Sequence, residues 1–254
     1  MPERVLRPDK ASCDRRGLAI LLAFAALSGT ALRAEPWPPL PPPRPPIPSL
    51  NESPAAPSTP NNLSQVSGTS ECLSRLRIAG FDVEAAETPA VANGDCRIDN
   101  PVKLRAIAVA GRESPLLLAA EPIVACRFAE SLGGWLGSLV APAIVGATNS
   151  ELAVVHTGPG FQCRNRNRLP SGKLSAHAEG LAIDIASFQL ADKSHIPVKP
   201  DGNEQHVATI NAVRRAACGW FTTVLGPGSD ASHADHLHLD VQLHGSSDRY
   251  RICQ

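Results

Sequence analysis

Hydrophobic residues alternate with small or polar ones in residues 181–186, near the middle of the chain. One set of positions is aliphatic: Leu181, Ile183 and Ile185. The other set holds small residues and one acid: Ala182, Asp184 and Ala186. A period of two predicts a β-strand with one apolar face, and the preceding residues 175–180 are typical of a turn. Asp184 is therefore expected among small side chains, with space beside it.

A second alternating segment, residues 236–241, lies near the end of the chain. Its polar positions are His236, His238 and Asp240, and its apolar positions are Leu237, Leu239 and Val241. The pattern predicts another strand, with both histidines and the acid on one face.

Two longer segments, residues 123–140 and 204–225, repeat their apolar residues at helical spacing. The first predicts a buried helix face made of Val124, Phe128, Leu132, Trp135, Leu136 and Leu139. The second predicts a core stripe made of Val207, Ile210, Val213, Ala217, Phe221 and Val224. A loop is expected at residues 191–203, with His195 and His206 exposed.

Shorter patterns complete the expected fold. Residues 72–80 read as a helix ended by Gly80, residues 102–109 and 153–156 as strands, and residues 226–228 as a turn. The end of the chain, Ile252–Cys253, is expected to be pinned to the domain. These elements predict an α+β fold in which a small antiparallel sheet, flanked by helices and tied by disulfides, carries the site.

The N-terminal region differs from this domain in composition. Five basic residues precede an apolar run at residues 17–27, which predicts a secretory signal peptide at residues 1–34 and is too short to span a membrane. An uncleaved anchor is the alternative. Residues 35–70 hold 12 of the 24 prolines, so we expect a disordered linker rich in polyproline II, either a spacer or a docking ligand. The domain itself should occupy residues 71–254.

Six of the seven cysteines follow the signal peptide. An even number in an exported chain predicts disulfides, and sequence proximity favours Cys72 with Cys96, Cys126 with Cys163, and Cys218 with Cys253. No Cys-x-x-Cys spacing suggests a cysteine metal site. The expected location is an exported, oxidising compartment.

Composition limits the partners. The chain has 254 residues, 43% of them hydrophobic, and a formal net charge of zero. A neutral chain exerts no broad attraction on nucleic acid or anionic membranes. We therefore expect no nucleic-acid partner, no stable membrane insertion after signal cleavage, and a monomer.

The two alternating segments together predict a metal site. Either motif alone could be a buried core histidine or a chance surface pair. Here, however, four of the eight histidines fall in residues 175–186 and 233–241, and each of these segments holds an acid and a strand pattern with one apolar face. Imidazole and carboxylate ligands suit Zn²⁺, and three protein ligands with an open fourth position are typical of a catalytic site. The expected ligands are His177, Asp184 and His238.

These residues resemble a known group of enzymes. Ser175-x-His177-x-x-Gly180-x-Ala182-x-Asp184, followed by His236-x-His238, resembles the lysostaphin, D-alanyl-D-alanine peptidase and hedgehog group of zinc peptidases. His233 adds a likeness to penicillin-insensitive murein endopeptidases. Within that group, residues 72–253 are similar to the bacterial extensin-like C-terminal domain family, through Cys163-Arg-Asn-Arg166, the Ser-x-His motif, Trp220-Phe221 and Val224–Gly228.

The resemblance implies hydrolysis of an amide bond in the stem peptide or cross-link of peptidoglycan. Related peptidases place an arginine upstream of the first metal motif to hold the substrate or its developing oxyanion, which makes Arg164 and Arg166 candidates; a solvated surface run is the alternative. The alternative function is a catalytically inactive, zinc-containing module that binds the cell wall. A structural wall glycoprotein is a third reading, disfavoured because the proline tract is short and unrepetitive.

Roles for the remaining residues follow from their places in the strands. His236 shares its face with His238 and is the first choice for acid and base work, while His233 would assist or orient it. Asp235 competes as base, although alternation points it away unless the strand begins after it. Asp240 would support a ligand histidine, with an ordinary surface acid as the alternative. Ser175 either contacts the substrate or caps the following turn.

Overall fold

A computed structural model describes residues 62–90, 95–246 and 249–254. The predicted signal peptide and most of the predicted linker lie outside the described residues. The helix α1 (Asn62–Ile78) begins inside the segment predicted as linker. It is anchored near its end by buried Leu76 and by the disulfide at Cys72, and it extends back from these anchors.

The described elements follow in chain order. The strands are β1 (Phe81–Ala85), β2 (Pro101–Ile107), β3 (Leu116–Leu118), β4 (Ile123–Ala125), β5 (Leu152–Thr157), β6 (Ala182–Leu190), β7 (His195–Pro197), β8 (Thr223–Leu225), β9 (Leu237–Asp240) and β10 (Ile252–Cys253). The remaining helices are α2 (Cys126–Trp135), η1 (Leu136–Val140), α3 (Ala141–Thr148), η2 (Arg166–Arg168), η3 (Ala176–Glu179), α4 (Glu204–Ala217) and η4 (Ala231–His233).

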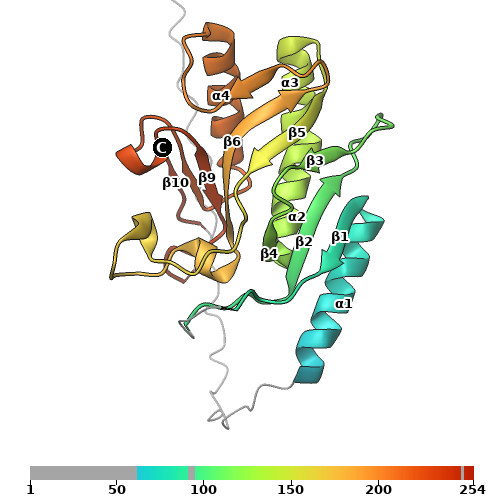
Figure 1. Cartoon of the computed structure of the whole chain (residues 1–254), viewed down its shortest axis with the longest axis vertical. Coiled ribbons are helices and arrows are strands. Elements are labelled where there is room, and N and C mark those ends of the chain that lie inside the picture. The colour runs from blue at the N-terminus through green and yellow to red at the C-terminus, as the bar shows by residue number, and fades with distance from the viewer. Residues whose placement is uncertain (1–61, 91–94, 247–248) are drawn as a thin grey trace, which may run out of the picture. The chain divides into compact units, whose positions relative to one another are not determined.

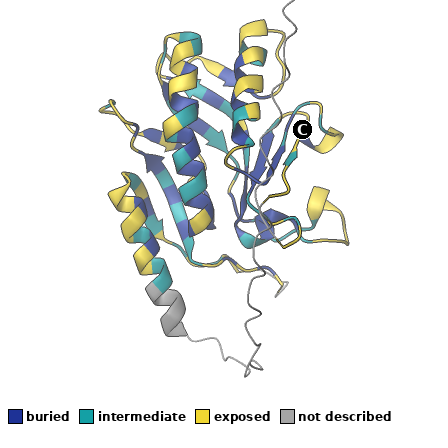
Figure 2. Ribbon diagram, turned by 180° about the vertical axis from the view of Figure 1, so that it is seen from behind, coloured by how far each residue is buried: buried dark blue, intermediate teal, exposed yellow. Residues whose placement is uncertain are grey.

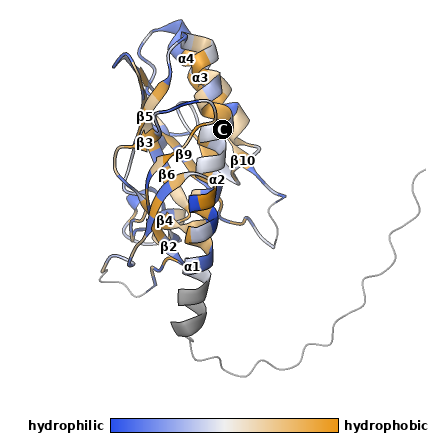
Figure 3. Ribbon diagram, turned by 90° about the vertical axis from the view of Figure 1, so that its right-hand side faces the viewer, coloured by the Kyte–Doolittle hydropathy of each residue, from blue (hydrophilic) through white to orange (hydrophobic). Residues whose placement is uncertain are grey.

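The strands form one mixed sheet, which confirms the predicted α+β class. Its order is β1-β2-β3-β5-β6-β9-β8-β10, with β4 paired to β2 and β7 paired to β6. The sheet has 10 strands, so it is larger than predicted, and the pairs β3–β5 and β8–β10 are parallel rather than antiparallel. In Figure 1 the helices α2, α3 and α4 lie behind the sheet, and Figure 3 shows the same arrangement from the side.

The hydrophobic core lies between these helices and the sheet, where Figure 2 shows buried residues on the facing surfaces. Phe221 is fully buried there and contacts two aromatic side chains of α2. Its ring centroid lies 5.5 Å from that of Trp135, edge to face, and 6.0 Å from that of Phe128. Aromatic pairs in such tilted arrangements are favourable beyond the area they bury. The apolar residues predicted for this helix face are therefore core residues.

The helix expected at residues 123–140 is wrong at both ends. Ile123–Ala125 forms β4, which pairs with β2, and its residues Ile123 and Val124 are β-branched and favour a strand. The helix then begins at Cys126 and continues to Thr148, through a wider π-helical turn at Leu136–Val140. This turn directly precedes Pro142, which lacks an N–H and would crowd the carbonyl four residues earlier in a regular α-helix.

The same continuous helix, Cys126–Thr148, is long and apolar enough to cross a membrane by length and composition. Half of its most apolar window is buried inside the protein, against the sheet. Core helices can have this composition, and the buried residues of this helix, among them Phe128 and Trp135, belong to the hydrophobic core.

The helix expected at residues 204–225 ends early, at Ala217, and Thr223–Leu225 is the strand β8. Threonine and valine favour a strand here because β8 lies between β9 and β10 and bonds to both. Five of the six predicted core residues are nevertheless buried; Val207 is half-buried. The expected loop at residues 191–203 contains a short strand, β7, which pairs with β6.

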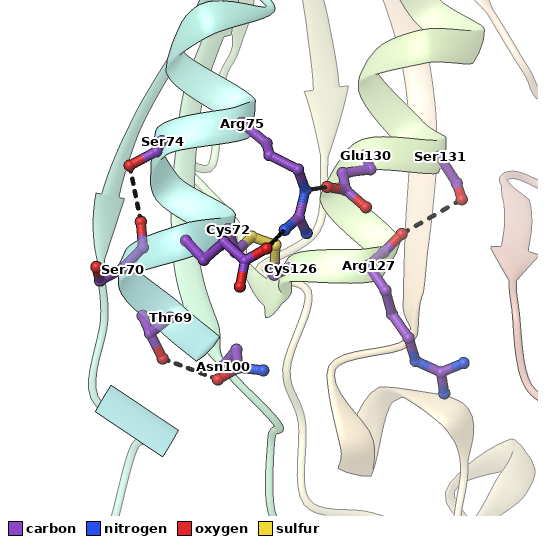
Figure 4. Close-up of a disulfide and its surroundings, with 11 residues drawn as sticks. Thr69, Ser70, Cys72, Ser74, Arg75, Asn100, Cys126, Arg127, Glu130 and Ser131 are labelled. Atoms are coloured by element: carbon purple, nitrogen blue, oxygen red, sulfur yellow. Dashed lines mark hydrogen bonds and ion pairs between the residues drawn. A yellow bond between two sulfur atoms is a disulfide. The ribbon is translucent and has the colours of Figure 1, made fainter. Parts of the chain in front are cut away.

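Three disulfides join the six cysteines of the domain. Cys218 pairs with Cys253 as predicted, which pins β10 at the chain end. The other two predicted pairings are wrong: Cys72 pairs with Cys126, and Cys96 with Cys163. Proximity in sequence misled because α1 packs beside the start of α2 (Figure 4), where Arg75 also bonds Glu130 across the two helices.

Candidate metal centre

Neighbouring strands bring two of the predicted ligands together. β6 and β9 are antiparallel, and Asp184 lies directly opposite His238 in their register. Directly opposite residues in an antiparallel pair point to the same face. The predicted alternation in both segments is therefore confirmed, and it places the carboxylate and the imidazole side by side.

The third ligand comes from the turn that precedes β6. His177 lies in the short helix η3, and the Ser175 hydroxyl accepts a hydrogen bond from its backbone N–H. Gly180 ends this helix in a left-handed conformation, with φ of 65°, and leads the chain into β6. Ser175 thus caps the turn, as one of its two predicted roles requires, and it also lines the cavity described below.

Three ligand atoms converge at one point. His177 Nε2 lies 3.2 Å from Asp184 Oδ1 and 3.3 Å from His238 Nδ1. His238 Nδ1 lies 3.0 Å from Asp184 Oδ1. Tetrahedral zinc, with bonds of about 2.0–2.2 Å, separates its ligand atoms by about 3.3 Å. The triangle has the size of one face of such a tetrahedron.

The hydrogen bonds on the far side of each ring fix which nitrogen carries the proton. His177 Nδ1 lies 2.6 Å from the Gly160 carbonyl oxygen, which can only accept, so this nitrogen donates. His238 Nε2 lies 3.1 Å from Asp240 Oδ2 and donates to that carboxylate. With one proton on each ring, lone pairs of His177 Nε2 and His238 Nδ1 face each other and Asp184. A positive charge between them, from a proton or a metal ion, would relieve their repulsion, so these groups could hold a divalent metal.

The charges around this point favour a cation. Burial disfavours the charged form of His238, but hydrogen bonds to Asp184 and Asp240 outweigh it and raise the pKa of His238 to about 9. Burial would raise the pKa of Asp184, yet hydrogen bonds from His177 and His238 hold that pKa well below its usual value. Both shifts have the same cause, the attraction between the imidazoles and the carboxylates, and both favour positive charge at this point. Asp240, buried beneath His238, has the supporting place predicted for it.

His236 lies at the edge of this centre, just before β9 begins. Its Nδ1 is 2.9 Å from Asp235 Oδ1, so this nitrogen donates to the acid. Its Nε2 points toward the ligands and lies 3.6 Å from Asp184 Oδ1. The alternation of a strand would point Asp235 away from the face of His236. The strand β9 begins only at Leu237, after both residues, so Asp235 can approach the His236 ring. Asp235 therefore holds the ring by its outer nitrogen rather than facing the metal ligands itself.

His233 is buried against the rings of His236 and His238, at centroid distances of 5.3 and 5.5 Å. Its Nδ1 is 2.8 Å from Asp230 Oδ1. The same carboxylate accepts the backbone N–H of His233 and thereby caps η4. His233 is thus placed to pack and orient its neighbours, and burial lowers its pKa despite the hydrogen bond to Asp230.

The predicted arginines lie on the loop that enters η3. Arg164 Nη2 lies 3.8 Å from Asp184 Oδ2, so this guanidinium reaches the metal ligands. Arg166 is exposed and donates to Gln242 Oε1 at 2.6 Å. The loop is tied down by the Cys96–Cys163 disulfide. Arg164 and Arg166 line one cavity of about 370 Å³ together with Ser175, Asp184, His233, His236 and His238.

Several groups that hold the site were not predicted from the sequence. The Gly160 carbonyl fixes His177 from 17 residues away, and a backbone oxygen leaves no trace in a residue pattern. Asp230 had a signal, because aspartate is a favoured residue at the start of a helix, and here it caps η4. Gln162 and Gln242, which hold the arginines, and His244, which bonds Thr223 in the same cavity, had none.

A second group of possible ligands, Cys72, Cys126 and Glu130, lies between α1 and α2. Its two cysteines form a disulfide (Figure 4), so their sulfur atoms are not available as thiolates. Among the residues that the structure describes, the set on β6, β9 and η3 is therefore the better metal site.

Comparisons with known proteins support one of the resemblances described above. Residues 70–254 match the protein-family model described as "Extensin-like protein C-terminus". Comparison with curated proteins and with solved structures gave no match. The match covers every element described above from the last turns of α1 onward.

Proposed function

The chain belongs to the family of extensin-like protein C-termini, and on that premise we propose that it is an exported, zinc-dependent peptidase of peptidoglycan. It would hydrolyse an amide bond in the stem peptide or in the cross-link. The proposal includes kinship with the lysostaphin, D-alanyl-D-alanine peptidase and hedgehog group, whose motifs His177, Asp184 and His238 resemble.

The observation that carries the proposal is the triangle of His177 Nε2, Asp184 Oδ1 and His238 Nδ1, with sides of 3.0–3.3 Å. Two imidazole nitrogens and one carboxylate oxygen are a ligand set that suits Zn²⁺. Three protein ligands would leave one position of a tetrahedron for solvent or substrate, and two of the three candidate ligands, Asp184 and His238, line the cavity. The chemistry that such an ion supplies is polarisation of a carbonyl group and acidification of a water molecule.

In this proposal His236 carries the proton. Because its Nδ1 donates to Asp235, its Nε2 is free to accept a proton from a water molecule beside the ligands and to pass it to the leaving amine. Asp235 is largely exposed and bonds the opposite nitrogen, so it acts as a positioning residue. Arg164, 3.8 Å from Asp184, is placed to hold the carbonyl oxygen of the scissile bond.

The compartment in which disulfides form supports peptidoglycan, a component of the cell wall, as the substrate. Three disulfides fit an exported or otherwise oxidising compartment. For a bacterial protein this means the periplasm or beyond, where peptidoglycan lies. Partners and the exact bond are inferred from this location and from the resemblance.

The test is release of new amine termini from purified peptidoglycan. Zinc-loaded protein should release them, while chelated protein and a His236→Ala variant should not. His206→Ala, which changes a histidine on α4 bonded to Asp201, should remain active. Zinc-loaded protein that sediments with peptidoglycan but releases no amines would instead support the inactive wall-binding module.

A further inference from the structure

Three arginines of one short loop meet at the cavity beside the metal ligands. Arg164, Arg166 and Arg168 all line it, and the acids that line it are Asp184 and Asp240. Both acids have partners, since Asp184 faces the imidazoles and Asp240 accepts from His238. The described lining of this cavity therefore carries more positive than negative charge, and a divalent metal would add to the excess.

The outer two arginines are held by neutral groups. Arg168 Nη2 donates to Gln162 Oε1 at 3.3 Å, and Arg166 Nη2 donates to Gln242 Oε1 at 2.6 Å. Among the described residues, neither forms an ion pair within 4.0 Å. Each guanidinium keeps further N–H donors for a ligand, because one hydrogen bond uses only part of its set.

Two guanidinium groups also share one acceptor. Gln162 Oε1 accepts from Arg164 Nε at 3.0 Å as well as from Arg168. Like charges gathered around a single neutral oxygen repel each other, and an anion placed among them would relieve that repulsion.

The backbone holds the loop in this form. Asn167 and Arg168 both have positive φ, 52° and 57°. The loop is closed by a bridge between Asn165 and Leu174 and anchored by the disulfide at Cys163. Arg166 and Arg168 are thus presented at the mouth of the cavity on a tied loop.

We propose that Arg166 and Arg168 form a subsite for a carboxylate of the substrate, next to the metal centre. Paired guanidinium groups bind carboxylates by charge-assisted hydrogen bonds, often two at a time. This inference rests on the proposed peptidase function and narrows its substrate to an acidic peptide. The carboxylate is either the free C-terminus of the peptide or an acidic side chain near the scissile bond.

Binding to the metal-free full chain, in the presence of a chelator, tests the subsite without turnover. The probes are one N-acetylated peptide with a free C-terminal carboxylate, the same peptide as a C-terminal amide, and the amide form with one internal glutamate. We expect a carboxylate peptide to bind about tenfold more tightly than the plain amide. Whether the C-terminal or the glutamate peptide shows the gain identifies the source of the carboxylate.

Matched variants locate the effect. Arg168→Gln and Arg166→Gln should each remove most of the preference, and Arg168→Lys should keep part of it, because the charge remains but the planar fork is lost. Arg215→Gln, which changes an exposed arginine of α4, should leave the preference unchanged. Both arginines at the cavity are exposed, so these variants should fold.

The outcomes separate this inference from the proposed function. Equal binding of all three peptides, or a preference that survives both glutamine variants, would overturn the subsite. If zinc-loaded protein cleaves carboxylate and amide peptides equally, the peptidase proposal stands and the subsite fails. If binding prefers the carboxylate but no peptide or peptidoglycan is cleaved, the subsite stands and the peptidase proposal fails.

Discussion

The candidate ligands depend on residues that would not touch the metal. Asp240 Oδ2 accepts from His238 Nε2, and its Oδ1 accepts from the backbone N–H of Gln242 and from Thr222 Oγ1. Both carboxylate oxygens therefore face donors. An asparagine at position 240 would direct its NH₂ group, which is itself a donor, either toward His238 Nε2 or toward the donors of Gln242 and Thr222.

Asp240→Asn should weaken zinc binding by about 10–100-fold, because it removes the acceptor or the charge that orients His238. The measurement is a competition titration with a chromophoric chelator. Asp192→Asn, an exposed acid that bonds Ser194, is the control and should bind zinc normally. Normal zinc affinity in Asp240→Asn would show that His238 is held without this acid, or that it is not a ligand.

Zinc binding should also depend on pH through His238. Burial opposes the imidazolium, but Asp184 and Asp240 raise the pKa of His238 to about 9, so below that pH the metal must displace a proton. The dissociation constant should therefore rise about tenfold for each pH unit below 9 from this residue alone. Titrations at pH 7, 8 and 9 check this, and calorimetry in two buffers should detect about one released proton at pH 7.

The same shift gives the metal-free protein its own pH dependence. Because folding raises the pKa of His238 above the usual 6.5, its contribution to stability is fully present below pH 6.5 and is lost as pH rises through about 9. Denaturant titrations of the metal-free protein between pH 6 and 10 measure this loss. For the zinc titrations, equal affinity at pH 7 and 8 would show either that His238 is not a ligand or that its pKa is not raised.

Asp235 should act on the proton carrier and not on the metal. Asp235→Asn removes the charge that holds the His236 Nδ1 proton, so we expect kcat on peptidoglycan to fall about 10–100-fold. Zinc content and KM should remain near those of the unaltered protein, because the ligands and the cavity are unchanged. A fall in zinc content, or an unchanged kcat and pH profile, would show that Asp235 has another role.

At the scale of elements, the site depends on a glycine that brings two segments together. Gly160 has φ of 81°, and its carbonyl fixes His177. A Cβ at this position would lie 2.5 Å from the Ile123 carbonyl oxygen of β4. Gly111 also has positive φ, 77°, but a Cβ there would meet nothing within 4 Å.

Gly160→Ala and Gly111→Ala therefore form a matched pair. Both should lose about 1–2 kcal/mol from the left-handed backbone, but Gly160→Ala should lose about 2 kcal/mol more, because backbone must shift. Chemical denaturation measures the difference. Gly160→Ala should also weaken zinc binding, whereas Gly111→Ala should not. Equal losses of stability would show that the loop at Gly160 moves away from β4 at little cost.

The sequence predicts those elements well whose pattern is local. Alternation in residues 181–186 and 236–241 was enough to place Asp184 and His238 on matching strand faces, because side-chain direction in a strand depends only on position. It could not separate helix from strand at Ile123–Ala125 or Thr223–Leu225. All but Thr223 are apolar and all are buried or partly buried, which suits either form, and the strands that they pair with, β2 and β9, are separate segments of the sequence.

At the scale of the whole domain, two of the disulfides hold different parts of the structure. Cys72–Cys126 joins α1 to the start of α2, away from the cavity, and Cys96–Cys163 anchors the loop that carries the arginines. They close loops of similar length, with sequence separations of 54 and 67 residues. The entropy that a cross-link removes from the unfolded chain depends weakly on this length.

Replacing each pair of cysteines by alanine separates stability from function. Both double variants, Cys72→Ala with Cys126→Ala and Cys96→Ala with Cys163→Ala, should lose about 2–4 kcal/mol of stability in denaturant titrations. Both should still bind zinc, because the ligands lie on β6, β9 and η3. Only the second should also lose the preference for a carboxylate peptide, because its arginine loop is released at Cys163. If the first loses that preference equally, the loop is held by the fold as a whole and the Cys96–Cys163 bridge has no special part in substrate binding.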